Sequence, residues 1–175
     1  MSDNKNQNGI PVNLRDFILS YSNDPEDHGW DREDVLAVLE LIQAGKEDEL
    51  DLDDPDLVNS IGCWFESGVC TNVDIEKAVY WFERAVALGD DLARSNLADI
   101  LRKGSHGYPK DLGRAFQLYS ECGLPYAHYR CGEFLEHGWG VEKDLDKART
   151  YYQLAYKEGH HLAKKKRAEW DFMKE

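Results

Sequence analysis

The chain has 175 residues, of which 42% are hydrophobic and 11% aromatic, enough to form the core of one domain and to exclude wholesale disorder. It contains no apolar run of about 18 residues and no apolar stretch near its N-terminus, so neither a membrane span nor a secretory signal is expected, which favours a cytoplasmic protein. The formal net charge of -13 argues against binding to nucleic acid or to an anionic membrane, because like charges repel.

The negative charge is concentrated in the first third of the chain. Residues 1–54 contain 15 acidic and 4 basic side chains, a net charge of -11, whereas residues 55–175 contain 19 and 17, a net charge of -2. Two interpretations are open. The acidic side chains could keep a solvated segment soluble, or they could form a face that docks onto a basic partner.

In chain order, residues 1–10 are polar and predict a disordered tail, and residues 11–54 predict an acidic helical segment. Asn13 can cap a short helix, and Asp31 can cap a second helix that ends at Gly45. The acidic residues 46–54 that follow predict a solvated connector. The two helices would form either a degenerate first pair that caps the rest of the chain or a separate binding segment.

From residue 55 onward one amphipathic pattern recurs. Residues 74–89 read D-I-E-K-A-V-Y-W-F-E-R-A-V-A-L-G, and residues 144–159 read D-L-D-K-A-R-T-Y-Y-Q-L-A-Y-K-E-G. A shortened copy begins at Asp111. Each copy opens with an aspartate suited to cap a helix, and its apolar residues follow at three- and four-residue steps. The chain is therefore predicted to be a repeat protein.

A second helix precedes each of these stretches. One column of small residues in it has steps of 36, 34 and 36 residues, a period typical of a helical solenoid: Gly62, Ala98, Gly132 and Ala168. Another column predicts a left-handed end of the helix: Gly68, Gly104 and Gly138. Each unit thus consists of a helix A, a loop, and a helix B capped by aspartate. Aromatic residues of helix B are predicted to fill the space between helices: Tyr80, Trp81, Phe82, Phe116, Tyr119, Tyr151 and Tyr152.

The four cysteines form no C-x-x-C pair, so thiols are expected in a reducing cytosol. Within the repeat register Cys122 and Cys131 stand where other copies have alanine or leucine, and both are predicted to fill the core. In an oxidising compartment, Cys122–Cys131 and Cys63–Cys70 bridges could instead close local loops.

The segment G-E-F-L-E-H-G-W-G-V-E-K-D-L-D-K-A-R-T-Y-Y-Q-L-A-Y-K-E-G, residues 132–159, resembles a Sel1-like repeat, a relative of the tetratricopeptide repeats. The resemblance covers residues 55–175, as three repeats and a terminal capping helix, and it leaves residues 1–54 outside. It implies an all-α fold, a right-handed α–α superhelix, that serves as a protein-binding scaffold without catalysis of its own.

The resemblance also implies that helix A residues line a concave face that binds another protein or a peptide, although any of them could simply belong to a solvated helix face. The candidate residues are Asn59, Glu66, Ser95, Asp99, Arg102, Lys103, Tyr126, Tyr129, Glu133, Glu136, His137, Lys165 and Glu169. The basic run at residues 164–167 is expected to be solvated.

Other chemistry finds little support in the sequence. Glu133 and His137 share one helix face but are too few for a metal site, and no H-E-x-x-H, phosphate-binding loop or G-x-S-x-G motif is present. No catalytic residue, cofactor or metal is therefore expected, and the chain is predicted not to be an enzyme. The alternative function is an acidic inhibitor or immunity-type protein that neutralises a basic partner enzyme by charge complementarity.

Overall fold

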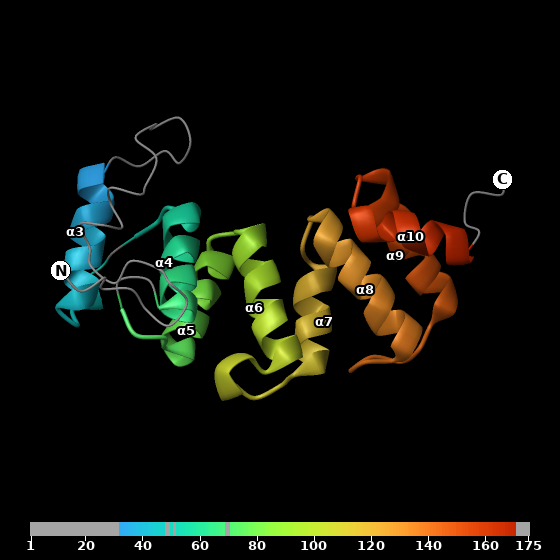
Figure 1. The fold of residues 1–175 in the computed structure, drawn as a ribbon, viewed down its shortest axis with the longest axis horizontal. Coiled ribbons are helices and arrows are strands. Elements are labelled where there is room, and N and C mark those ends of the chain that lie inside the picture. Colours follow the sequence, from blue (N-terminus) through green and yellow to red (C-terminus); the bar gives the residue numbers. More distant parts are fainter. Residues whose placement is uncertain (1–31, 48–49, 51, 69–70, 171–175) are drawn as a thin grey trace, which may run out of the picture. The chain divides into compact units, whose positions relative to one another are not determined.

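The computed structural model describes residues 32–47, 50, 52–68 and 71–170 (Figure 1). Within these residues all regular structure is helical and no strand is present, as predicted for an all-α fold. The helices are α3 (Arg32–Gln43), α4 (Pro55–Ser67), α5 (Ile75–Ala87), α6 (Asp91–Lys103), the 3-10 turn η2 (Ser105–Gly107), α7 (Leu112–Ser120), α8 (Pro125–His137), α9 (Leu145–Lys157) and α10 (His161–Trp170). The predicted tail 1–10 and the helix capped by Asn13 lie outside the described residues. None of the helices in this part of the chain is long and apolar enough to cross a bilayer.

The chain forms two compact units, residues 1–81 and 82–175, and the boundary falls within α5. In the first unit Val35, Val38, Leu39 and Ile42 of α3 are buried, and Gly45 follows the helix with a φ of 67°. The prediction of a solvated connector after it holds for Lys46, Asp53 and Asp54, which are exposed, but is wrong for two residues. Leu50 is buried, and Glu47 forms an ion pair with Lys77 of α5, so these two residues contact their own unit.

The second unit alternates helices A and B. Helix α6 packs on α7, α7 on α8, α8 on α9, and α9 on α10, so that every helix contacts its neighbours in the sequence. Large buried side chains fill the space between them, among them Phe82, Ile100, Tyr119, Phe134 and Tyr152. The predicted role of the helix B aromatics is confirmed for Trp81, Phe82, Tyr119 and Tyr152, which are fully buried. It is wrong for Tyr80, which is 51% exposed because it lies on the opposite side of α5.

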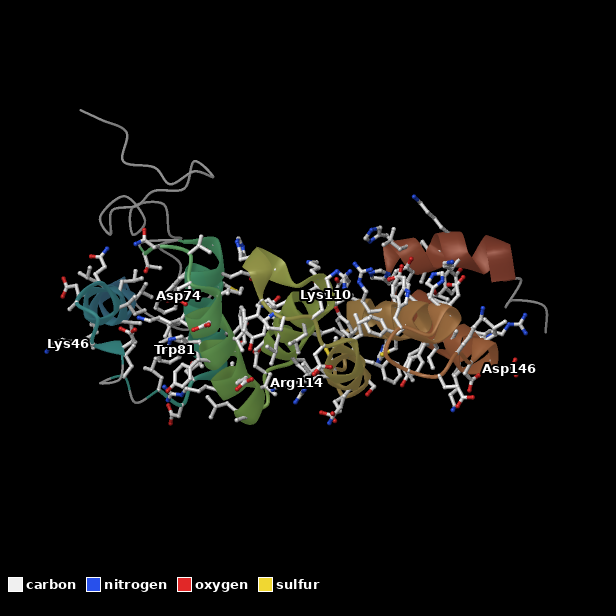
Figure 2. All side chains as sticks on the ribbon, turned by 90° about the horizontal axis from the view of Figure 1, so that it is seen from below. Lys46, Asp74, Trp81, Lys110, Arg114 and Asp146 are labelled. Carbon is white, nitrogen blue, oxygen red and sulfur yellow. The ribbon has the colours of Figure 1, made fainter. Side chains whose placement is uncertain are left out.

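Three hydrogen bonds recur in each repeat and fix the position of helix B relative to helix A. The glycine that ends helix A has a φ of 69–72°, and its N–H donates to a carbonyl four residues earlier. The aspartate that caps helix B, as Asp74 does at the start of α5 (Figure 2), accepts a hydrogen bond from the backbone three residues later. Its own N–H donates to helix A, over the distances Asp74–Phe65 2.9 Å, Asp111–Leu101 3.0 Å and Asp144–Leu135 3.0 Å. The recurrence confirms the predicted repeat.

The predicted shortening of the second helix B is also confirmed, because α7 has 9 residues whereas α5 and α9 have 13. The loop between α8 and α9 lies against the start of this short helix. A Cβ on Gly140 would lie 2.5 Å from the carbonyl carbon of Leu112 and 2.6 Å from the backbone nitrogen of Gly113. The second glycine of the G-W-G-V loop is thus required by this close approach.

Candidate protein-interaction face

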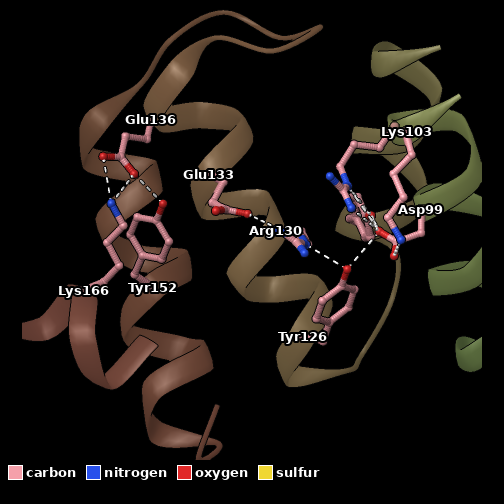
Figure 3. Close-up of polar contacts among 10 residues, drawn as sticks. Asp99, Lys103, Tyr126, Arg130, Glu133, Glu136, Tyr152 and Lys166 are labelled. Carbon is pink, nitrogen blue, oxygen red and sulfur yellow. Dashed lines mark hydrogen bonds and ion pairs between the residues drawn. The ribbon is translucent and has the colours of Figure 1, made fainter. Parts of the chain in front are cut away.

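The candidate residues of the second unit lie on three A helices, α6, α8 and α10. Asp90 caps α6 by accepting a hydrogen bond from the Ala93 N–H, and Pro125 stands in the first turn of α8, where its missing N–H costs nothing. Figure 3 shows Tyr126, Arg130, Glu133 and Glu136 along α8, with Asp99 and Lys103 of α6 at one end and Tyr152 and Lys166 at the other. We call this set of side chains, together with Arg102 and Tyr119, the A-face network.

Asp99 is the acceptor at the centre of one half of the network. Its Oδ1 accepts hydrogen bonds from Arg102 Nη2 at 3.0 Å, from Tyr126 Oη at 2.9 Å and from the Tyr119 hydroxyl. Its Oδ2 accepts from Lys103 Nζ at 2.6 Å. Burial alone would raise the pKa of Asp99, but the hydrogen bonds from Lys103, Tyr119 and Tyr126 outweigh it and hold the pKa at about 2. Asp99 is therefore ionised at neutral pH and ties α6 to both α7 and α8.

Arg130 continues the network along α8. Its Nε donates to the Tyr126 hydroxyl at 2.9 Å and its Nη1 to Glu133 Oε2 at 2.5 Å. The guanidinium also lies 4.8 Å from the ring centroid of Tyr126 and 6.0 Å from that of Tyr129, within the range of a cation–π contact. Arg130 is thereby held in one orientation by an oxygen on either side and an aromatic ring beneath it.

Glu136 is the acceptor of the second half. Its Oε2 accepts a hydrogen bond from the Tyr152 hydroxyl of α9 at 2.5 Å and lies 3.0 Å from Lys166 Nζ of α10. Burial would raise the pKa of Glu136, but the hydrogen bonds from Tyr152 and Lys166 prevail and lower it. These contacts join α8, α9 and α10 through one carboxylate.

The structure corrects the predicted exposure of three candidate residues. Asn59, Ser95 and Tyr129 are buried, because they lie on the side of helix A that packs into its own unit. Lys103, His137 and Lys165 are exposed. The Glu169 side chain lies outside the described residues. The other candidates are half-buried: Glu66, Asp99, Arg102, Tyr126, Glu133 and Glu136. Asn59 and Glu66 belong to the first unit, and the remaining candidates belong to the second.

Sequence reasoning missed four members of the A-face network. Arg130 had a signal, because it stands four residues after Tyr126 and three before Glu133, within reach along one helix. Tyr119 and Tyr152 were assigned only to packing, although a buried tyrosine hydroxyl needs a partner. Lys166 was expected to be solvated with the rest of its basic run, and this is wrong, since it pairs with Glu136.

The described residues offer little reactive chemistry. No group of three possible metal ligands occurs among them. Cys122 and Cys131 are buried thiols, as predicted for core positions, and they form no disulfide. Burial raises the pKa of Cys131 to about 12, so this thiol is protonated at neutral pH and is a poor nucleophile. Cys70, of the alternative Cys63–Cys70 bridge, lies outside the described residues.

Comparison with solved structures supports the fold. The chain resembles a Sel1 repeat protein from Oxalobacter formigenes, with a TM-score of 0.61 and 24% identity over 73% of this chain and 55% of that one. It also resembles a protective antigen of uropathogenic Escherichia coli strains that displays an SLR fold, with a TM-score of 0.63 and 23% identity over 79% of this chain and 29% of that one. For the cysteine-rich protein B of Helicobacter pylori the TM-score is 0.52 and the identity 19%, over 75% and 90%.

Two relatives share more of the sequence over a shorter length. The chitin synthase regulator SKT5 of Saccharomyces cerevisiae is 30% identical over 86 residues, and an uncharacterized protein of Neisseria meningitidis is 32% identical over 87 residues. These matches cover 47% and 48% of this chain but only 12% and 18% of the relatives' own lengths. Three segments, residues 59–90, 92–121 and 125–160, match the model of the Sel1 repeat. They make up more than half of the chain, which therefore belongs to the Sel1 repeat family.

Proposed function

We propose that this protein is a non-enzymatic adaptor that binds a partner protein or peptide through the face formed by its A helices. Sel1 repeat proteins generally mediate protein–protein interactions, and the family is typically a non-catalytic repeat scaffold. In this proposal residues 55–175 form the binding scaffold on its concave side, residues 11–54 form its N-terminal cap, and residues 1–10 form a tail.

The observation that carries the proposal is the A-face network. Hydrogen bonds from Tyr126 to Asp99 and from Lys166 to Glu136 connect three consecutive A helices through side chains that are still partly exposed. Side chains held by neighbours before a partner arrives lose less rotamer freedom on binding, which favours affinity. Tyrosine and arginine, present here as Tyr126 and Arg130, are also the residues that most often dominate binding energy at interfaces.

In this view the candidate residues have two roles. Those that are exposed or half-buried would contact the partner: Glu66, Asp99, Arg102, Lys103, Tyr126, Glu133, Glu136, His137 and Lys165. The buried ones, Asn59, Ser95 and Tyr129, would hold the A helices in place beneath the contact surface. Glu169 remains a proposed contact on the basis of its register position alone.

Site-specific photo-crosslinking of the full chain tests the proposal. A photoreactive amino acid placed at Lys103 or at His137 should capture the same partner in living cells, and an excess of unmodified chain should compete with the capture. The matched control is Lys157, an exposed lysine of helix B α9. If Lys157 captures the partner as efficiently as Lys103 and His137, the A helices are not the binding face.

The second candidate, an acidic inhibitor of a basic enzyme, is favoured by the net charge of -11 in residues 1–54. A photoreactive residue at Glu40, which is exposed on α3, should then capture a basic protein, and the yield should fall steeply as salt is raised. Capture from Lys103 without capture from Glu40 would exclude this candidate.

A further inference from the structure

In the A-face network the carboxylate acceptors are more fully hydrogen-bonded than the N–H donors of the arginines. Both oxygens of Asp99 are engaged, Glu133 receives Arg130, and Glu136 receives Tyr152 and Lys166. The two arginines have N–H groups left. Arg130 uses Nε and Nη1, so its Nη2 has no partner among the described residues, and the same holds for Nη1 of Arg102.

The charges of the network also leave its cations in excess. Asp99 is shared by two cations, Arg102 and Lys103, and the side chain of Lys103 remains 51% exposed. The network contains four cations (Arg102, Lys103, Arg130, Lys166) and three carboxylates (Asp99, Glu133, Glu136), a net charge of +1, in a chain whose total is -13. Two of the exposed cations on the B helices, Arg114 and Lys147, each have a carboxylate of their own, Glu83 and Asp144.

We propose that the part of the A face around Arg102, Lys103 and Arg130 binds an acidic protein segment, whose carboxylates accept the unused N–H groups of these cations. Each arginine carries five N–H donors in a planar fork that matches a carboxylate, and an ionised acceptor roughly doubles the strength of the hydrogen bond. This inference rests on the proposed function and names its partner class. It differs from the expectation of a basic partner, which followed from the total charge of the chain rather than from the charge of this face.

The test measures binding of the full chain to labelled peptides by fluorescence anisotropy at physiological ionic strength. The probe is a fluorescein-labelled Glu-Ser repeat of twelve residues, and the comparison probes are the matching Lys-Ser repeat and a single-stranded oligonucleotide. Lys103→Gln should weaken binding of the Glu-Ser probe about fivefold, as expected for a surface ion pair worth up to about 1 kcal/mol. Arg102→Gln with Lys103→Gln should weaken it more than tenfold.

Lys157→Gln is the control for the single variant, and Lys147→Gln with Lys157→Gln is the control for the double variant, because each removes the same charge from helix α9. Neither control should change binding of the Glu-Ser probe. Thermal unfolding checks that the double variant is folded, and the exposed single variant keeps the test valid if it is not. Equal weakening by variants and controls, no binding of the Glu-Ser probe, or tighter binding of the oligonucleotide would each overturn the inference.

The outcome is separable from that of the proposed function. If Lys103 and His137 capture a partner in cells but the Glu-Ser probe does not bind, the A face is a binding face and its preference for acidic segments is wrong. If Lys103 and Lys157 capture equally, the proposed function itself is wrong.

Discussion

The ring of Tyr152 in α9 lies directly against Gly132 in α8. A Cβ on Gly132 would be 2.6 Å from Cε1 and 2.7 Å from Cδ1 of that ring, closer than such atoms approach in proteins. Tyr152 is fully buried, and its hydroxyl donates to Glu136 one turn further along α8. The absence of a side chain at residue 132 therefore allows the Tyr152 ring to pack against α8. In this position the Tyr152 hydroxyl reaches Glu136 of the A-face network.

Gly132→Ala should destabilise the protein by up to about 2 kcal/mol. The added methyl group must displace a ring that is held at both ends, at a cost of about 1–3 kcal/mol, and the gain of about 1 kcal/mol in helix propensity offsets only part of it. Chemical denaturation of the variant measures the change in the free energy of unfolding.

Gly113→Ala is the matched control for this substitution. Gly113 also lies in a helix, α7, but it is exposed and the nearest atom to an added Cβ is 3.6 Å away. This variant should be as stable as the original chain or slightly more stable. Equal losses at the two positions would show that the Tyr152 contact does not decide the effect, because helix propensity favours alanine over glycine at both.

The repeat could be predicted from the sequence because its signals are local. Asp74, Asp111 and Asp144 cap their helices, the glycines at the ends of the A helices have left-handed conformations, and the short α7 follows from the missing residues before Gly123. Each of these features depends on residues within one turn of a helix, and each therefore leaves a mark in the local pattern.

The A-face network could not be predicted because it depends on how helices from different units meet. In the repeat register Glu136 and Lys166 stand where the preceding repeat has Arg102 and Arg130. Glu136 and Lys166 form an ion pair, but the two arginines at the equivalent positions repel each other, so the repeat pattern does not indicate this contact. The burial of Ser95 and Tyr129 has the same origin, since the sequence does not state how each A helix is rotated toward its helix B.

Asp99→Asn should lower stability at neutral pH by about 2 kcal/mol and should flatten the loss of stability in acid. The folded pKa of about 2 lies below the ordinary value of 3.8, so ionised Asp99 contributes stability that is fully present above pH 4. That contribution disappears as the pH falls from about 4 to 2, where the two chains should become nearly equal in stability.

Unfolding of both chains at a series of pH values checks this prediction. Glu142→Gln, an exposed carboxylate in the loop before α9, is the control, and it should leave the curve unchanged. A constant difference between Asp99→Asn and the original chain down to pH 2 would mean that Asp99 stabilises the fold independently of its charge.

Lys166→Ala should loosen α10. Lys166 connects α10 to Glu136 of α8 and lies 5.5 Å from the ring centroid of Tyr152, so its removal leaves a half-buried carboxylate with one donor fewer. Amide hydrogen exchange in residues 161–170 should accelerate about tenfold, equivalent to about 1.4 kcal/mol of local stability. Exchange in α6 and α7 should not change.

Lys165→Ala is the control for α10, because Lys165 is exposed next to Lys166 in the same helix. It removes the same charge and adds the same helix propensity, and it should leave exchange in residues 161–170 unchanged. If Lys165→Ala accelerates exchange as much as Lys166→Ala, the effect arises from the charge of the helix and not from the contact with Glu136.

Asp111→Ala should destabilise the second unit more than its exposed position suggests. Asp111 Oδ1 accepts the Arg114 N–H at 2.9 Å, and its own N–H donates to the Leu101 carbonyl, so one residue both starts α7 and ties it to α6. With 9 residues, α7 has few intrahelical hydrogen bonds to compensate for a lost cap, and a cap of this kind contributes about 1 kcal/mol.

Asp111→Ser retains a side-chain acceptor and should recover most of the loss in the free energy of unfolding. Equal destabilisation by alanine and serine would assign the effect to the aspartate charge near the helix N-terminus, because serine keeps the hydrogen bond and removes only the charge.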